Sequence, residues 1–299
     1  MCIAVWGLDR SDYALILATN RDEFLARPTT NAHFHSFEAR SDPAPATGKV
    51  LSGRDRVAGG TWFGINRAGR VALLTNITEP PKEFDSSRGS LVSSYLLSDS
   101  SHPLEDEVGK IIPQDAKFAG FNLLLLAPSP VPNQPLRFDA ALITNHGSGG
   151  VLTSRPLSDA ERIGSAVSNG VDGAGGSEWP KVKRLTQDFE NVLQSITPDM
   201  KEAELTDRLF EALAWQSPET VAQRSELRKT VHVSPVPITL DGLSNSKPGS
   251  YGTRLSTVLL IRKDGQVLFI ERDIWQLEGG EVVRAPPDSE RTFRFQLGV

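Results

Sequence analysis

The chain has 299 residues, of which 38% are hydrophobic and 23% are charged, a balance typical of a globular protein with a buried core. Its formal net charge of −5 argues against nucleic acid or an anionic membrane as the main partner. No apolar run reaches about 18 residues, so we expect no integral membrane segment, and the single cysteine excludes an internal disulfide and favours the reducing cytoplasm.

Two short apolar runs, residues 2–8 and 13–18, flank a polar turn at the start of the chain. Both runs are rich in Ile, Val and Leu and are too short for a stable helix, so they predict a β-hairpin with a four-residue loop. A hairpin brings its two ends together, and Cys2 is therefore expected beside residues 19–22. A thiol would then lie next to amide, guanidinium and carboxylate groups.

Cys2 directly follows Met1 and is small enough for a methionine aminopeptidase to remove that Met. The mature chain would then carry a thiol and a free α-amine on the same residue. The reference pKa of an α-amine is about 7.7–8.0 and that of a free thiol is about 8.5, so the neutral amine can act as the base for its own thiol. The alternative is that Cys2 is a small hydrophobic residue packed in a strand.

The next segment, residues 24–55, has several prolines and little periodicity, and it predicts a long loop. Residues 61–66 and 71–77 predict a second hairpin, whose second strand ends near Asn76. An Asn at the end of a strand is commonly a turn residue, and it is also a residue type that donates an amide N–H to a developing oxyanion.

The remaining elements alternate between helical and strand patterns. Apolar residues at helical spacing predict helices at residues 88–99, 103–111, 179–196 and 201–215. Further strands are predicted at residues 118–129, 136–144, 150–154, 163–167, 251–262, 266–273 and 291–297, and residues 216–250 are predicted to be irregular. Strands come first, helices follow, and strands close the chain, which suits an α+β fold of two antiparallel sheets with helices outside them.

Several short motifs occur in a fixed order along the chain. They are Met-Cys-Ile at the start, Asn-Arg-Asp-Glu-Phe at 20–24, Gly-Gly-Thr-Trp-Phe-Gly-Ile at 59–65, Leu-Thr-Asn at 74–76, Gly-Phe-Asn-Leu at 120–123, Ser-Asn at 168–169, Trp-Pro-Lys-Val at 179–182 and Tyr-Gly-Thr-Arg at 251–254. In this order the motifs resemble the NRDE family over nearly the whole chain. The resemblance implies a single domain over residues 1–299 with the N-terminal nucleophile hydrolase fold, a four-layer αββα sandwich.

The resemblance also implies a set of catalytic residues. It makes Cys2 the nucleophile and Asp22 the carboxylate that interacts with the amine of the nucleophile. It makes Asn76 and Asn169 the amide donors of an oxyanion hole, and it brings Arg254 close to the nucleophile from a late strand.

Asn20, Arg21 and Trp62 are predicted to contact the substrate. The amidases among the N-terminal nucleophile hydrolases carry an Arg at the position that Thr19 occupies in this chain. Here the Arg is residue 21, next to Asp22, and strand alternation turns adjacent side chains toward opposite faces of the sheet. Either a bulge brings Arg21 to the site or the chemistry differs. As alternatives, Arg21 forms structural ion pairs at the end of the hairpin, and Trp62 is a packing residue.

Three functions are compatible with these features. The first is a cysteine-nucleophile hydrolase of non-peptide amides or thioesters. The second, implied by the family, is a carrier or chaperone of a small amphipathic molecule, either haem or an acyl-CoA or lipid metabolite, in a cytoplasmic, mitochondrial or Golgi-associated protein. The third is a role in Golgi organisation. We predict no metal and no resident cofactor, with haem only as a ligand, because His33 and His35 lack a third ligand in a supporting pattern.

Overall fold

The computed structural model describes residues 2–37, 48–80, 82, 84–98, 103–111, 117–129, 134–239 and 248–298. Its strands are β1 (Ile3–Arg10), β2 (Tyr13–Phe24), β3 (His33–His35), β4 (Val50–Ser52), β5 (Phe63–Asn66), β6 (Val71–Asn76), β7 (Phe121–Pro128), β8 (Phe138–Thr144), β9 (Thr153–Pro156), β10 (Ser165–Val167), β11 (Val236–Ile238), β12 (Gly249–Arg262), β13 (Gln266–Asp273), β14 (Trp275–Glu278), β15 (Glu281–Arg284) and β16 (Arg291–Gln296). Its α-helices are α1 (Arg88–Leu97), α2 (Leu104–Ile111), α3 (Asp159–Ile163), α4 (Pro180–Gln194) and α5 (Glu202–Leu213), and its short 3₁₀ helices are η1 (Gly176–Glu178), η2 (Arg224–Lys229) and η3 (Pro287–Ser289).

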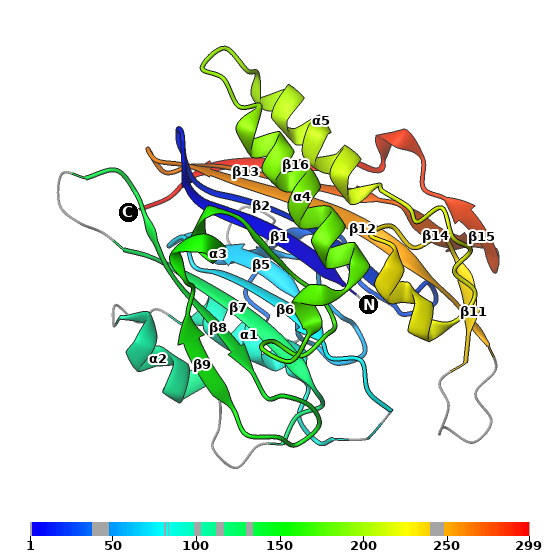
Figure 1. Ribbon diagram of the computed structural model, residues 1–299. Helices are drawn as coiled ribbons and strands as arrows, with labels where there is room; N and C mark the ends of the chain where they lie inside the picture. The colour runs from blue at the N-terminus through cyan, green and yellow to red at the C-terminus, as the bar shows by residue number, and fades with distance from the viewer. Residues whose placement is uncertain are drawn as a thin grey trace.

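Most of the described strands form two large antiparallel sheets, and β14 and β15 form a separate two-stranded sheet (Figure 1). The first has the order β10-β1-β2-β12-β13-β16, with β11 paired to β12, and the second has the order β3-β4-β5-β6-β7-β8-β9. The predicted N-terminal hairpin is present as β1 and β2, and its loop is shorter than predicted because β1 continues to Arg10. This hairpin lies inside the first sheet, between β10 and β12.

The two sheets pack face to face and are covered by helices on their outer faces. Trp6, Leu124 and Phe269 belong to the apolar core between the sheets. Helices α4 and α5 cover the outer face of the first sheet, and α1 and α2 cover the outer face of the second (Figure 1). The α+β fold class and the four-layer αββα order are therefore confirmed.

The structure differs from the sequence prediction mainly in short elements. Strands β3 and β4 lie in the segment predicted to be a loop, and β11 lies in the segment predicted to be irregular. Each of these strands has three residues, too few for an alternating pattern to be recognised. Helix α3 replaces the start of the strand predicted at 163–167, and the hairpin of β14 and β15 was not predicted.

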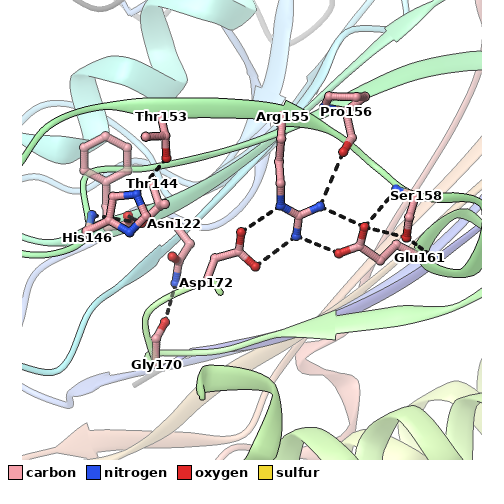
Figure 2. A network of polar contacts seen from close by, with 11 residues as sticks. Asn122, Thr144, His146, Thr153, Arg155, Pro156, Ser158, Glu161, Gly170 and Asp172 are labelled. Carbon is pink, nitrogen blue, oxygen red and sulfur yellow. Dashed lines mark hydrogen bonds and ion pairs between the residues drawn. The ribbon is translucent and has the colours of Figure 1, made fainter. Parts of the chain in front are cut away.

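A polar network anchors the segment that follows β10 (Figure 2). Arg155 of β9 donates hydrogen bonds to the carboxylates of Asp172 and Glu161. The Asn122 amide of β7 donates to the carbonyls of Ser168 and Gly170 at 3.1 and 2.8 Å. These two residues follow β10 and have no strand pairing of their own among the described residues, so the Asn122 side chain satisfies their backbone carbonyls. Asn169 lies between Ser168 and Gly170, so the hydrogen bonds of Asn122 and the ion pair of Arg155 with Asp172 together fix its position.

Candidate active site

Cys2 lies directly before β1, where β1 faces the far end of β2. Ile3 pairs with Asn20 in the antiparallel register, so continuing the register places Cys2 opposite Arg21. Successive side chains alternate between the faces of a strand, and Ala4 belongs to the core between the sheets. The half-buried side chain of Cys2 therefore points toward the space between the two sheets.

Cys2 lines a cavity of about 140 Å³ at this end of the hairpin. The predicted site residues that line the cavity with it are Arg21, Asp22, Trp62 and Asn76. The other lining residues are Glu23, Arg27, Asp55, Ala58, Gly60, Thr61, Leu74, Ser87, Arg88 and Gly89. The lining is mostly polar and charged, so the cavity suits the polar part of a small molecule.

The Cys2 thiol is not activated by its surroundings alone. Burial raises the pKa of the thiol above its ordinary value, and the Asp22 carboxylate acts in the same direction. The charge of Arg21 and hydrogen bonding from the backbone N–H of Asp22 lower the pKa, without reversing the effect of burial. The thiol therefore needs a base before it can act as a nucleophile.

Asp22 lies beside Cys2, and hydrogen bonds hold both its backbone and its carboxylate in place. Its Oδ1 accepts a hydrogen bond of 2.6 Å from the Thr253 hydroxyl, and its carbonyl accepts one of 2.6 Å from the Tyr251 hydroxyl. Burial raises the pKa of the Asp22 carboxyl, while the Lys181 ammonium and the Thr253 hydrogen bond lower it. Asp22 is thus a buried acidic group next to the start of β1, and the Lys181 ammonium favours its ionised form.

Arg21 reaches the cavity because of strand alternation. It points to the face opposite to that of Asp22, and this is the face that Cys2 shares. Its guanidinium carbon lies 4.0 Å from the centroid of the Trp62 ring, and its Nη2 lies 4.0 Å from the Glu23 carboxylate. The Nη1 atom is buried and has no hydrogen-bond partner among the described residues. The Arg is therefore beside the thiol without a bulge in β2.

Asn76 and Asn169 occupy different positions relative to the cavity. The Asn76 side chain lines the cavity and makes no hydrogen bond to any other described residue. The Asn169 amide does not line the cavity, and its Nδ2 donates to the Asn76 carbonyl at 2.5 Å. Ser168 donates to the Cys2 carbonyl at 2.7 Å. Asn169 therefore holds the backbone of Asn76, and in this structure its Nδ2 is bound to that carbonyl instead of facing the cavity.

Asn20 lies on the helix side of the first sheet, away from the cavity. Its Nδ2 donates to the carbonyls of Leu213 and Val231 at 2.9 and 3.1 Å, and its Oδ1 accepts from the Ser256 hydroxyl at 2.6 Å. Both ends of the amide are occupied by the protein. Asn20 therefore joins the hairpin to the helix layer and does not line the cavity in which Cys2 lies.

Arg254 lies at a bulge beside the cavity. Thr253 pairs with Asp22 and Leu255 pairs with Arg21, so Arg254 is the extra residue between two ladder pairs. Its guanidinium donates to the Arg27 carbonyl, and burial, together with the charge of Arg21, lowers its pKa to about 10. Arg254 is therefore near the predicted site, but it is not among the residues that line the cavity with Cys2.

Two charged residues near Cys2 were missed by the sequence analysis. Arg88, at the start of α1, lines the cavity, and its Nη1 donates to the Gly120 carbonyl at 2.9 Å. Lys181, in the first turn of α4, is fully buried. A signal for Lys181 is present in the sequence, because it lies four residues before Leu185 on the apolar face of the helix.

The described residues contain no cluster of three or more His, Cys, Asp or Glu side chains able to hold a metal ion. His33 and His35 are neighbours, with ring centroids 4.8 Å apart, but the Nε2 of His35 pairs with the Ser52 hydroxyl at 2.9 Å. In the described part of the chain, no helix combines the length and apolar character needed to cross a bilayer.

The sequence is similar to that of one protein family. The model of the Transport and Golgi organisation 2 family matches residues 1–276. The human Transport and Golgi organization protein 2 homolog (Homo sapiens) is 28% identical over 287 residues, covering 92% of this chain and 93% of the relative. An uncharacterized protein of Saccharomyces cerevisiae is 30% identical over 326 residues, covering 99% of this chain and 100% of the relative.

A solved structure has the same arrangement of sheets and helices. The Caenorhabditis elegans ortholog of N-acylethanolamine-hydrolyzing acid amidase matches with a TM-score of 0.50 at 12% identity, covering 87% of this chain and 92% of that chain. A likeness at this identity concerns the fold alone. The four layers are those of the N-terminal nucleophile hydrolases, as the motifs predicted.

Proposed function

We propose that this chain, which belongs to the Transport and Golgi organisation 2 family, is a cysteine-nucleophile hydrolase of non-peptide amides or thioesters. The observation that supports the proposal most is that one cavity is lined by Cys2, Arg21 and Asn76. These side chains supply a nucleophile, a cation beside it and an unoccupied amide donor. The resemblance of the motifs to N-terminal nucleophile hydrolases implies that such a combination performs acyl transfer.

In the proposed reaction, Met1 is first removed, and the α-amine of Cys2 accepts the proton of the thiol. The thiolate attacks the carbonyl carbon of the substrate, a C–S bond forms, and the carbonyl electron pair moves onto the oxygen. When the tetrahedral intermediate collapses, the C–N or C–S bond of the substrate breaks and the leaving group takes the proton from the α-ammonium. Water then attacks the acyl-enzyme with the amine as base, and the acid product and free thiol are released.

The surrounding residues have separate roles in this proposal. The Asn76 amide donates a hydrogen bond to the oxyanion, a contribution worth about 10²–10³ in rate for one donor. Asn169 holds the Asn76 backbone through its 2.5 Å hydrogen bond. Arg21 stabilises the thiolate electrostatically, since its charge lowers the pKa of Cys2. Asp22 holds the α-amine in the orientation from which it can accept the thiol proton.

A second candidate is binding of a small amphipathic molecule without turnover. Burial raises the pKa of the Cys2 thiol, and a thiol kept protonated is a poor nucleophile, so this observation favours a carrier. The polar part of the ligand would occupy the cavity of about 140 Å³, while its apolar part would remain outside. The name of the human relative refers to transport and Golgi organisation, which agrees with either candidate.

The hydrolase is tested by the intact mass of the purified protein and by a screen of acyl amides and acyl thioesters. We expect a mass without Met1, single-site alkylation at Cys2 and turnover of at least one substrate class. Cys2→Ala should abolish turnover and leave the thermal midpoint unchanged, because the side chain is small and half-buried.

Two matched variants separate the candidates. Cys2→Ser keeps a nucleophilic oxygen and should retain a small part of the turnover, whereas Cys2→Ala should retain none. Full turnover in Cys2→Ala, or retention of Met1 in the active protein, contradicts the hydrolase. Equal ligand affinity in wild type and Cys2→Ala, with no turnover in either protein, supports the carrier.

A further inference from the structure

Lys181 is a buried cation without a hydrogen bond. The residue is 0% exposed, and its Nζ has no hydrogen-bond partner among the described residues. It is the second residue of α4, after Pro180, and therefore lies at the positive end of the helix dipole. Both burial and this position disfavour an ammonium group. An ammonium group is stable there only if a nearby negative charge compensates for these costs.

The negative charge is supplied by the first sheet, on the face that α4 covers. Ile16 and Ala18 of β2 pack against the helix layer, and Asn20 donates to a carbonyl of α5. Alternation places Asp22 on this same face, since it lies two residues after Asn20. Val182, the neighbour of Lys181, belongs to the same apolar cluster as Ile16. The Asp22 carboxylate and the Lys181 ammonium are thus enclosed between one strand end and one helix start.

We propose that Lys181 is a positioning residue for the nucleophile, whose buried ammonium balances the Asp22 carboxylate. The inference rests on the proposed function, because it concerns the α-amine that Cys2 carries after loss of Met1. Without this buried cation, the Asp22 carboxylate would hold a proton on that amine more strongly, and a protonated amine cannot accept the thiol proton. With Lys181 in place, the carboxylate orients the amine and leaves it neutral near physiological pH.

The charged groups around the pair agree with this role. Burial lowers the pKa of Lys181, and the two groups that raise it again are Asp22 and Cys2. On the sheet side, the charge of Glu23 raises the pKa of Asp22, and the charge of Arg21 lowers the pKa of Cys2. Arg21 lies on the cavity face, so it cannot take the place of Lys181 on the helix face.

The experiment measures the rate of alkylation of Cys2 by iodoacetamide as a function of pH, with the full-length processed protein. Lys181→Met removes the charge and keeps the length and volume of the side chain. Loss of the cation removes a positive charge that acts on Asp22 and Cys2, and this raises the pKa of both the amine and the thiol. The midpoint of the alkylation profile should therefore rise by about one pH unit or more, in line with the effect of one nearby charge.

The control is Lys183→Met, which removes the same charge from the same helix. Lys183 is exposed and paired with Glu178 at 2.6 Å, so its removal should leave the midpoint unchanged. The shift in Lys181→Met should also persist at about 1 M KCl, because salt screens exposed charges much more than buried ones. If Lys181→Met does not fold, Lys181→Gln provides the same loss of charge with a polar side chain and the same expected shift.

The outcomes separate the inference from the proposed function. An alkylation midpoint that is low in wild type and unchanged in both Lys181 variants overturns the inference and leaves the hydrolase standing. A Cys2 that reacts in wild type no faster than a free thiol overturns both. An upward shift in the Lys181 variants alone, with Lys183→Met equal to wild type, supports the inference.

Discussion

At the scale of single residues, His232 shows how burial sets a protonation state. It is 5% exposed, and its Nε2 accepts a hydrogen bond of 3.0 Å from the Trp275 indole. Burial, together with the charge of Arg284, lowers its pKa to about 4. A protonated imidazole cannot accept the indole N–H, so the contact that joins residue 232 to β14 requires the neutral form.

The stability of the protein should therefore depend on pH through His232. The unfolded pKa is about 6.5, so as pH falls from there toward 4 the unfolded chain gains a proton that the folded chain does not. The stability present above pH 6.5 is lost in this window, by about 2 kcal/mol at pH 4.5. His232→Gln keeps the acceptor and does not titrate, so urea unfolding at pH 7.5 and 4.5 should show a smaller difference for this variant. The exposed His146→Gln should behave as wild type, and equal differences in all three proteins would contradict the prediction.

The roles of single residues were only partly predictable from the sequence. Alternation correctly separated Arg21 from Asp22, but which of the two faces belongs to Cys2 depends on the register between β1 and β2. The position of Asn169 depends on a hydrogen bond to the Asn76 backbone across 93 residues of sequence. Local patterns do not contain such contacts, because they are made only when distant segments meet.

At the scale of elements, the Arg155 network joins β9, α3 and the segment before α4 (Figure 2). Glu161 accepts from Arg155 at 2.7 and 2.8 Å, and it also closes the capping box of α3 with Ser158. The Arg155 hydrogen bonds, acting against burial, lower the pKa of Glu161 to about 2. One carboxylate thus holds a helix start and a loop anchor together.

Glu161→Gln should destabilise the protein by roughly 1 kcal/mol at neutral pH, since solvent screens this partly exposed pair. The folded pKa lies below the unfolded value of about 4.3, so the contribution of Glu161 is present above pH 4.3 and is lost as pH falls toward 2. The difference between wild type and variant in urea unfolding should narrow between pH 7 and pH 3. Glu178→Gln, in an exposed ion pair with Lys183, is the matched control and should have no measurable effect. A difference that does not change with pH would show that the charge of Glu161 is not involved.

Elements with strong periodicity were predicted well, and weakly patterned ones were not. The predicted strand at 266–273 has the bounds of β13, and the helix predicted at 179–196 contains α4. The hairpin of β14 and β15 was missed because its residues are half-buried or exposed on both faces, which gives no alternation. The three-residue strands β3, β4 and β11 are too short to show an alternating pattern, so their sequences do not predict that they pair in a sheet.

At the scale of the whole molecule, the core between the two sheets joins early and late segments of the chain. Phe63 of β5 stacks on Phe269 of β13 with ring centroids 5.7 Å apart and an interplanar angle of 13°. Phe293 of β16 packs edge-on against Phe269 at 6.1 Å. Phe269 is 1% exposed and therefore contacts both sheets from a fully buried position.

Phe269→Ala should reduce the free energy of unfolding by about 3–5 kcal/mol, because it leaves a cavity between the sheets. The measurement is urea unfolding followed by circular dichroism and by tryptophan fluorescence. Val282→Ala, at an exposed position on β15, should change the free energy by less than about 0.5 kcal/mol. A loss below about 1 kcal/mol for Phe269→Ala would indicate that the two sheets are not held together at this contact.

The layered fold was predictable because the chain begins with strands, continues with helices and ends with strands, which is typical of sheets covered by helices. The order of strands within each sheet was not predictable from periodicity, since β2 pairs with β12 across more than half of the chain. The resemblance to a known family supplied the four-layer arrangement that composition and spacing left open.

The position of the N-terminal hairpin within its sheet also determines when the thiol site is completed during biosynthesis. Ribosomes make β1 and β2 long before β10 and β12, the strands that flank them. Ser168, which holds the Cys2 carbonyl, and Thr253, which holds Asp22, are likewise translated late. A nascent chain that ends before residue 249 therefore contains Cys2 without β12, the strand beside β2. The cavity around Cys2 is therefore completed only when most of the chain has been translated, and incomplete polypeptides lack the strands and side chains that enclose Cys2.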